Sequence, residues 1–354
     1  MLILQNSGFS YPNPNQVPDY CYFYHLIVTA LASLNEIKAP IQRHMDAFEG
    51  KFRNSMKSSV PLLDTITRYI IKRKGKQIRP MFVFLSAGLC GTVNESTYRA
   101  ASLIELLHTA TLVHDDVVDD SNLRRGFFSL NALWKNKIAV LVGDYLLSKG
   151  LLVALEQDEF ELLKIVSNAV REMSEGELLQ IEKARKPDVE EAVYFEIIRK
   201  KTASLIASCC SCGAASVNAP REMAQTMWQF GEAVGIAFQL KDDLLDYDQA
   251  TITGKPRGTD IRDQKMTLPL IYLLNHSDFM EKRRIVHIVK NHPSDPEAVT
   301  RLIDQIKNRG GIEYARLKME EYREKSLRAL SVFPDNEYRK SMEQLVLFTT
   351  ERRA

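Results

Sequence analysis

Two groups of aspartates repeat one spacing at distant places in the chain. Each group reads D-D-x-x-D, and together they comprise Asp115, Asp116, Asp119, Asp242, Asp243 and Asp246. In a helix, residues four apart share a face, so the first and last carboxylates of each group would point the same way. Carboxylates one turn apart repel each other, by roughly a few tenths of a kcal/mol. Mg²⁺ would offset this repulsion, because it takes oxygen ligands and is usually held by carboxylates and substrate phosphates.

A solvated acidic helix end is the alternative interpretation of either group taken alone. Two copies of the group, each on an otherwise apolar helical run, are harder to explain as surface decoration. Two such helices facing each other would form a cage for several Mg²⁺ ions and one diphosphate. The duplication therefore favours metal-assisted chemistry on a diphosphate.

The segments that must position these carboxylates show helical periodicity almost throughout. Pro61 and Pro80 are predicted to open two helices at the favoured first-turn position. Further helices are predicted over residues 96–120, 137–157, 159–183, 189–217 and 223–247, with four or five shorter ones after Lys265. The uncharged run 202–220 predicts a helix buried on all sides. We expect an all-α fold, a single large helical bundle around a deep central cavity.

Residues 1–35 differ from the rest of the chain in composition. They are rich in proline and asparagine, and their apolar run 20–34 is shorter than the roughly 20 residues that span a bilayer. We predict an N-terminal extension over residues 1–35, weakly ordered or forming an extra helix. Residues 36–354, which no linker divides, are predicted to form one catalytic domain.

The overall charge and the cysteines exclude several classes of protein. With 47 basic and 45 acidic residues the net charge is +2, so nothing indicates nucleic-acid binding. Cys209 and Cys212 form a C-x-x-C pair, but no second pair or histidine follows at zinc-site spacing. We interpret the cysteines as buried helix residues and expect the protein in the cytoplasm, with at most peripheral membrane contact.

Six ordered motifs resemble those of the all-trans polyprenyl diphosphate synthases, the family of octaprenyl- and heptaprenyl-type long-chain enzymes. They are GKQIRP (75–80), HDDVVDDSNLRRG (114–126), GDYLL (143–147), KT (201–202), FQLKDDLLDY (238–247) and GTDIRDQKMTLPL (258–270). The resemblance runs from about residue 37 to the C-terminus. It implies the all-α isoprenoid synthase fold, a homodimer, and Mg²⁺ on the two aspartate groups, with three ions per site.

The resemblance also implies a reaction, the condensation of isopentenyl diphosphate with an allylic diphosphate such as farnesyl diphosphate. The implied isopentenyl diphosphate site comprises Lys76, Arg79, His108 and Arg125. The implied allylic diphosphate site comprises Arg124, Lys201, Thr202, Gln239, Lys255 and Lys265. The departing diphosphate would be stabilised by Mg²⁺ held by Asp115, Asp119 and Asp242, together with Arg124 and Lys201. Alternatively, His108 is a core histidine, and Lys255 and Lys265 are solvated loop residues. The chain departs from the family pattern at Gln77, where many members carry a basic residue.

The product length depends on a position that the family places five residues before the first aspartate. An aromatic residue there stops chain growth early, and this chain has Ala110 instead. Thr111 beside it is small, and Leu107, deeper in the helix, is apolar but not aromatic. We therefore expect a product of roughly six to ten isoprene units, because each unit needs about one helical turn of depth. Such products are precursors of quinone side chains.

Other functions remain as alternatives. One is a short-chain prenyl diphosphate synthase with the same chemistry and a shallower pocket. A class I terpene cyclase would not need Lys76, Arg79, His108 and Arg125. A non-catalytic partner subunit of a heteromeric prenyl synthase would be expected to have lost one aspartate group, and a di-iron bundle would need E-x-x-H motifs.

Overall fold

A computed structural model of the chain describes residues 32–72, 75–124, 127–184, 190–248 and 257–351. The elements are α2 (Leu34–Lys38), the 3₁₀ turn η1 (Ala39–Ile41), α3 (Gln42–Ser55), α4 (Pro61–Lys72), α5 (Ile78–Cys90), α6 (Glu95–Val118), β1 (Leu123–Arg124), β2 (Phe127–Phe128), α7 (Leu130–Leu155), α8 (Phe160–Ala184), α9 (Glu191–Ile198), the π-helical η2 (Arg199–Ala203), α10 (Ser204–Ser216), α11 (Arg221–Asp246), α12 (Thr259–Arg262), α13 (Leu268–Asn275), α14 (Phe279–Asn291), α15 (Pro296–Asn308), α16 (Gly311–Leu330) and α17 (Glu337–Glu351). The predicted all-α fold is confirmed. The one described sheet is a hairpin in which Leu123 pairs with Phe128.

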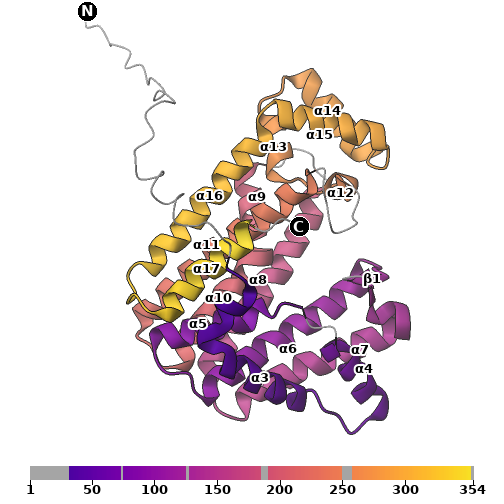
Figure 1. Cartoon of the computed structure of the whole chain (residues 1–354). Helices are drawn as coiled ribbons and strands as arrows, with labels where there is room; N and C mark the ends of the chain where they lie inside the picture. The colour runs from indigo at the N-terminus through magenta and orange to yellow at the C-terminus, as the bar shows by residue number, and fades with distance from the viewer. Residues whose placement is uncertain (1–31, 73–74, 125–126, 185–189, 249–256, 352–354) are drawn as a thin grey trace, which may run out of the picture.

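Helix α10 lies at the centre of the bundle. It packs against α5, α6, α8 and α11, and nearly every residue from Ser204 to Ser216 is buried. The prediction of a helix buried on all sides is therefore confirmed for this uncharged segment. The main hydrophobic core surrounds it and includes Phe82, Leu103 and Phe230 from α5, α6 and α11. α16 covers the other side of α11, as Figure 1 shows.

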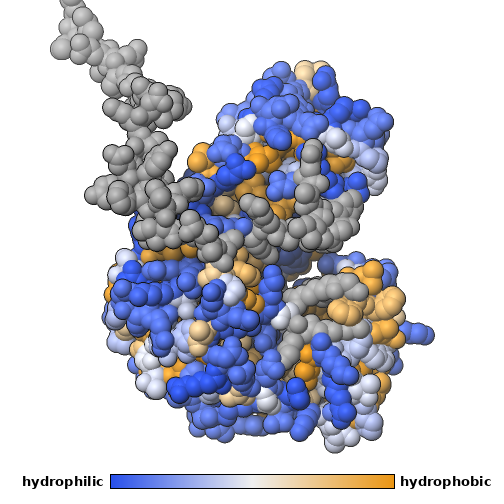
Figure 2. Space-filling view, viewed as in Figure 1, coloured by the Kyte–Doolittle hydropathy of each residue, from blue (hydrophilic) through white to orange (hydrophobic). Residues whose placement is uncertain are grey.

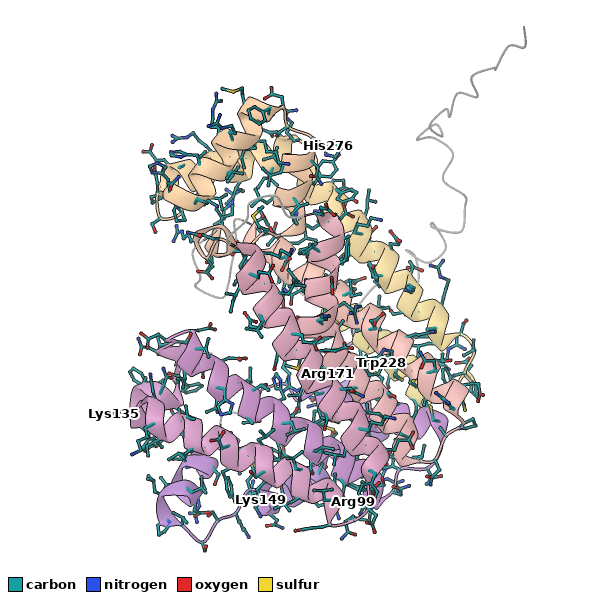
Figure 3. All side chains as sticks on the ribbon, turned by 180° about the vertical axis from the view of Figure 1, so that it is seen from behind. Arg99, Lys135, Lys149, Arg171, Trp228 and His276 are labelled. Atoms are coloured by element: carbon teal, nitrogen blue, oxygen red, sulfur yellow. The ribbon has the colours of Figure 1, made fainter. Side chains whose placement is uncertain are left out.

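Helices α6 and α7 pack along most of their length and carry the hairpin at one end (Figure 1). α7 is kinked at Lys135, whose φ of 70° and ψ of 159° are not helical. Viewed from behind, Lys135 lies at the end of this pair away from Lys149 and Arg99 (Figure 3). By length and composition α7 could cross a membrane, but helices of folded cores pass the same test, and 33% of its most apolar window is buried.

The segment from α12 to α15 forms a smaller cluster at the opposite end of α11 from its first residue, Arg221 (Figure 1). Its core contains Leu273, Ile285, Leu302 and Ile306. The outline of the molecule is indented between this cluster and the β1–β2 hairpin (Figure 2). The ends of α6 and α11 that carry the aspartates both lie on this side.

The domain prediction stays a prediction. α2 begins at Leu34, where the side chain of Ser33 and the side chain of Glu36 form a reciprocal capping box. This first described helix therefore starts inside the predicted extension, two residues before position 36. Residues 1–31 lie outside the described residues.

Candidate active site

The first aspartate group lies at the C-terminal end of α6. Asp115 and Asp119 are exposed, whereas Asp116 is buried with 5% of its surface accessible. Asp119 caps the helix, and its backbone N–H donates to the carbonyl oxygen of Asp115 at 2.8 Å. The helix end thus presents the first and last carboxylates of the group together and turns the middle one inward, as four-residue spacing predicts.

The GDYLL motif on α7 positions the residue next to Asp115. A Cβ atom at Gly143 would lie 2.1 Å from Nε2 of His114, so glycine at this position leaves room for the imidazole ring against α7. Nε2 of His114 lies 3.3 Å from the carbonyl oxygen of Val140 and 3.5 Å from Oδ1 of Asp144. No role was predicted for His114 from the sequence.

In the second group, Asp243 is the most enclosed carboxylate. The hydroxyl of Tyr194 donates to its Oδ2 at 2.6 Å, and Nε2 of Gln239 donates to its Oδ1 at 2.8 Å. Burial is the main cause that raises the pKa of Asp243 to about 7, against the lowering effect of both donors. Both carboxylate oxygens of this predicted metal ligand therefore accept hydrogen bonds from protein side chains.

The remaining carboxylates of the second group differ from Asp243. Asp242 is half-buried. Asp246 accepts the backbone N–H groups of Thr259 and Asp260, each at 3.0 Å, and so holds the first turn of α12. Burial and the nearby Asp260 carboxylate raise the pKa of Asp246. Asp246 thereby ties the FQLKDDLLDY motif to the start of GTDIRDQKMTLPL.

The predicted allylic residues Thr202 and Gln239 meet directly. Thr202 lies in the π-helical turn η2, and its Oγ1 donates to Oε1 of Gln239 at 2.8 Å. Lys201 forms an ion pair with Glu177 and donates to Oε1 of Gln180 at 3.4 Å. π-helical turns are frequent at functional sites because they displace one residue from the helical register.

Two of the predicted isopentenyl diphosphate residues, Lys76 and Arg79, lie at the start of α5. Gln77 adopts a left-handed conformation with a φ of 55°, immediately before the helix, which therefore begins earlier than Pro80. Lys76 is exposed and its Nζ lies 5.1 Å from the ring centre of Phe348. Arg79 pairs with Glu105 of α6, one turn from the half-buried His108.

The remaining predicted basic residues are Lys265, Arg124, Arg125 and Lys255. Lys265 pairs with Asp260 at 3.0 Å and with Asp263 at 3.3 Å, and its side chain is 43% exposed. Arg124 lies in β1. Arg125 and Lys255 lie outside the described residues.

The two aspartate groups do not form one metal cluster in the described part of the chain. Among those residues, no group of three or more His, Cys, Asp or Glu side chains is arranged to hold a metal ion. Each group instead lies at the C-terminal end of its own helix, the first on α6 and the second on α11.

The predicted chain-length residues face different surroundings. Ala110 is buried and belongs to a cluster between α6, α4 and α7 that includes Ile66 and Leu146. Leu107 belongs to the main core, where its Cδ2 lies close to Gly150. Thr111 is half-buried and its Oγ1 donates to the carbonyl oxygen of His108 at 2.9 Å.

Residues 60–306 match the polyprenyl synthetase family. This chain belongs to that family. An all-trans-nonaprenyl-diphosphate synthase (geranyl-diphosphate specific) from Rhodobacter capsulatus is 35% identical over 90% of this chain and 97% of its own. The second component of a heptaprenyl diphosphate synthase from Bacillus subtilis is 32% identical over 87% of this chain and 88% of its own. The predicted family is therefore confirmed, and its members are prenyltransferases.

Solved structures of the family share this fold. A polyprenyl synthase from Caulobacter crescentus, complexed with calcium and isoprenyl diphosphate, superposes with a TM-score of 0.84 at 32% identity, over 92% of this chain and 99% of its own. A geranylgeranyl pyrophosphate synthase from Bacteroides thetaiotaomicron superposes with a TM-score of 0.77 at 37% identity, over 90% of this chain and 99% of its own. Similar folds thus occur in relatives that are named for long and for short products.

Proposed function

We propose that this polyprenyl synthetase condenses isopentenyl diphosphate head-to-tail with an allylic diphosphate, such as farnesyl diphosphate, into a long-chain all-trans polyprenyl diphosphate. The observation that carries the proposal is the pairing of Thr202 with Gln239 beside the second aspartate group, while the first group ends α6 on the same side of the molecule. The nonaprenyl and heptaprenyl relatives support a long product. We propose that this product is a precursor of quinone side chains.

The donor set on this side fits Mg²⁺. Asp115 and Asp119 are exposed on one face and Asp242 is half-buried, whereas Asp243 and Asp246 are hydrogen-bonded within the protein. Oxygen ligands of this kind suit a hard divalent cation. We propose that Asp115, Asp119 and Asp242 hold Mg²⁺, with three ions per site. When bound, Mg²⁺ would neutralise the developing charge of the departing diphosphate. The calcium in the Caulobacter relative supports the use of a divalent cation.

Two different sets of residues would bind the two substrates. Lys201, held by Glu177, and Arg124 would add positive charge where the allylic diphosphate departs. Lys76, Arg79, His108 and Arg125 would hold isopentenyl diphosphate, which forms no allylic cation and waits for its double bond to attack. The apolar helix faces would exclude water from the cation, and the released diphosphate would take the proton. Lys255 and Lys265 would add positive charge near the departing diphosphate.

We further propose that Ala110, Thr111 and Leu107 leave depth for a long chain. The buried Ala110 faces a cluster of side chains that an aromatic residue would have to displace. A short-chain synthase is the second candidate, because the Bacteroides relative with the same fold is named for a geranylgeranyl product.

We propose that two copies of the chain form a homodimer through α7. Leu133, Leu141, Leu152 and Leu155 are exposed along this helix, and a stripe of this kind is typical of a protein interface. The heptaprenyl relative is named as one component of an enzyme, so a different partner chain is the alternative. The free thiols of Cys90, Cys209, Cys210 and Cys212 fit the reducing cytoplasm.

One experiment tests the function. The purified protein alone is incubated with farnesyl diphosphate, labelled isopentenyl diphosphate and Mg²⁺, and the products are separated by chain length. We expect a ladder that ends in one long species and disappears when Mg²⁺ is chelated. A ladder that stops after one or two additions would indicate the short-chain synthase, cyclic products a terpene cyclase, and no product from folded protein a partner subunit.

A further inference from the structure

Tyr194 is a buried tyrosine whose hydroxyl reaches into the second aspartate group from another helix. It lies in α9, with 4% of its surface accessible, and packs among Ile198, Ala203 and Leu240. Its hydroxyl donates to Oδ2 of Asp243 at 2.6 Å. A buried tyrosine hydroxyl needs a partner, and this one holds a carboxylate of the proposed active site.

The hydrogen bonds continue from Asp243 to the allylic residues. Oδ1 of Asp243 accepts from Nε2 of Gln239 at 2.8 Å, and Oε1 of Gln239 accepts from Oγ1 of Thr202 at 2.8 Å. This series of hydrogen bonds therefore runs from α9 through α11 to η2. It ends at Thr202, which we propose contacts the allylic substrate.

The direction of each bond in this chain is fixed by its neighbour. Gln239 turns its NH₂ group toward Oδ1 of Asp243, which leaves its amide oxygen to accept from Thr202. The hydroxyl proton of Thr202 is then committed to Gln239. Without the donor from Tyr194, Oδ2 of Asp243 would lose its partner in a buried place, and the carboxylate would be released to rotate.

Close helix packing holds the two ends of the chain in register. A Cβ atom at Gly235 of α11 would lie 2.4 Å from Cα of Ala203, so η2 lies directly against α11 beside Thr202. The backbones of η2 and α11 are therefore held together by packing. The hydrogen bonds then determine how the side chains of Thr202 and Gln239 are oriented.

We propose that Tyr194 is a positioning residue for the allylic half of the site. By holding Asp243 it orients the amide of Gln239 and, through that amide, the hydroxyl of Thr202. The inference rests on the proposed function of the site. It assigns selectivity between the two substrates to a tyrosine outside the six sequence motifs.

The test is the Tyr194→Phe variant, which removes one hydroxyl and keeps the ring. We expect the KM for farnesyl diphosphate to rise about tenfold, while the KM for isopentenyl diphosphate stays within about twofold. The matched control is Tyr247→Phe. Tyr247 is equally buried, but its hydroxyl pairs with Thr267 and not with Asp243, so its loss should lower the melting temperature without a selective change in KM.

The Gln239→Ala variant makes the test specific to this chain of hydrogen bonds. If Tyr194 acts through Gln239, adding Tyr194→Phe to Gln239→Ala should leave the KM for farnesyl diphosphate unchanged. Additive effects in the double variant, or an equal rise of both KM values in Tyr194→Phe, would overturn the proposal and leave Tyr194 a structural residue.

A binding measurement separates this inference from the proposed function. Binding can be measured without turnover by calorimetry with Mg²⁺ and a thio analogue of farnesyl diphosphate. The analogue binds but does not lose its diphosphate group to form the allylic cation. We expect about tenfold weaker binding to Tyr194→Phe than to the wild type and to Tyr247→Phe. Equal affinities would overturn the positioning role, whereas absence of product from the wild type in the turnover assay would overturn only the proposed function.

Discussion

Arg79 at the start of α5 and Glu105 on α6 form a two-pronged ion pair. Nε of Arg79 donates to Oε1 of Glu105 at 2.7 Å, and Nη2 donates to Oε2 at 3.4 Å. The two side chains are only 23% and 15% exposed, so solvent screens the pair weakly. The contact engages the edge of the guanidinium group that carries Nε and Nη2, and we propose that it holds Arg79 in place to bind isopentenyl diphosphate.

The Glu105→Gln variant should therefore lose affinity for isopentenyl diphosphate. An amide offers one acceptor and adds donors, so it cannot hold both prongs of Arg79. We expect about a tenfold rise in the KM for isopentenyl diphosphate, with a smaller effect on kcat. Steady-state kinetics with farnesyl diphosphate in excess measure this.

The control for this variant is Glu95→Gln. Glu95 pairs with Lys51 on the surface, where the side chains are 66% and 44% exposed, and such pairs contribute little. Its kinetics should match those of the wild type. Equal KM values in the two variants would show that Glu105 does not aim Arg79.

The Ala110→Phe variant should make shorter products. Phenylalanine at this buried position must displace side chains between α6 and α7, and overpacking of this kind costs about 1–3 kcal/mol. The displaced volume would reduce the space for the growing chain, so the product ladder should stop after fewer additions. Ala110→Ser keeps the small volume and should leave the ladder unchanged. A Phe variant that is folded and yields full-length product would refute the role of Ala110.

Lys135 occupies a backbone conformation that suits glycine. Its φ of 70° and ψ of 159° lie in a region that costs other residues about 1–3 kcal/mol. Lys135→Gly should therefore stabilise the protein by about 1 kcal/mol, visible as a higher urea midpoint of unfolding. Lys137→Gly is the matched control, because this exposed lysine has a helical backbone and glycine there costs about 1 kcal/mol. Destabilisation of the same size in both variants would show that Lys135 is not strained.

The sequence predicted the helices better than the contacts between them. The long helices α6, α8 and α11 begin and end within a few residues of the predicted runs, because periodicity and charge are local properties. The single helix predicted over residues 189–217 was wrong, because the structure divides this run into α9, the π-helical η2 and α10. α7 starts earlier than predicted, at Leu130, and the two-residue strands β1 and β2 were not predicted. Short strands of this kind leave no alternating pattern to detect.

The partners of the site residues could not be predicted from spacing. Periodicity shows that Gln239 and Asp243 share a face of one helix, but not that Tyr194, 49 positions before Asp243, lies across from them. Glu105 was overlooked for the same reason, since Arg79 is 26 positions away. In both cases the deciding contact joins two helices, and a single sequence carries no signal for it.

His44 should make the stability of the protein sensitive to acid. Its ring stacks on Phe84, and its Nδ1 lies 2.8 Å from the hydroxyl of Tyr98. Burial, with a smaller contribution from Arg43, lowers the pKa of His44 below its ordinary value of 6.5. Below about pH 6.5 the unfolded chain therefore binds more protons than the folded one, and stability is lost as the pH falls through this window.

The measurement is the free energy of unfolding in urea at pH 7.5 and pH 5.5. We expect the wild type to lose more stability between these values than His44→Gln, whose side chain does not titrate. His287→Gln, which changes an exposed histidine, should behave like the wild type. The same loss in all three proteins would show that the acid sensitivity has another source.

The exposed stripe on α7 predicts how the chain assembles. Leu141 and Leu152 are 55% and 45% exposed and lie three helical turns apart on one face. Glutamate at both positions should prevent a second copy from docking, because it would bury charges without partners. We expect Leu141→Glu with Leu152→Glu to be a monomer by light scattering, where the wild type is a dimer. Leu317→Glu on α16 changes an equally exposed leucine away from the stripe and should stay dimeric. A dimer that survives the double substitution would place the interface elsewhere, and a wild type that is itself monomeric would favour a different partner chain for α7.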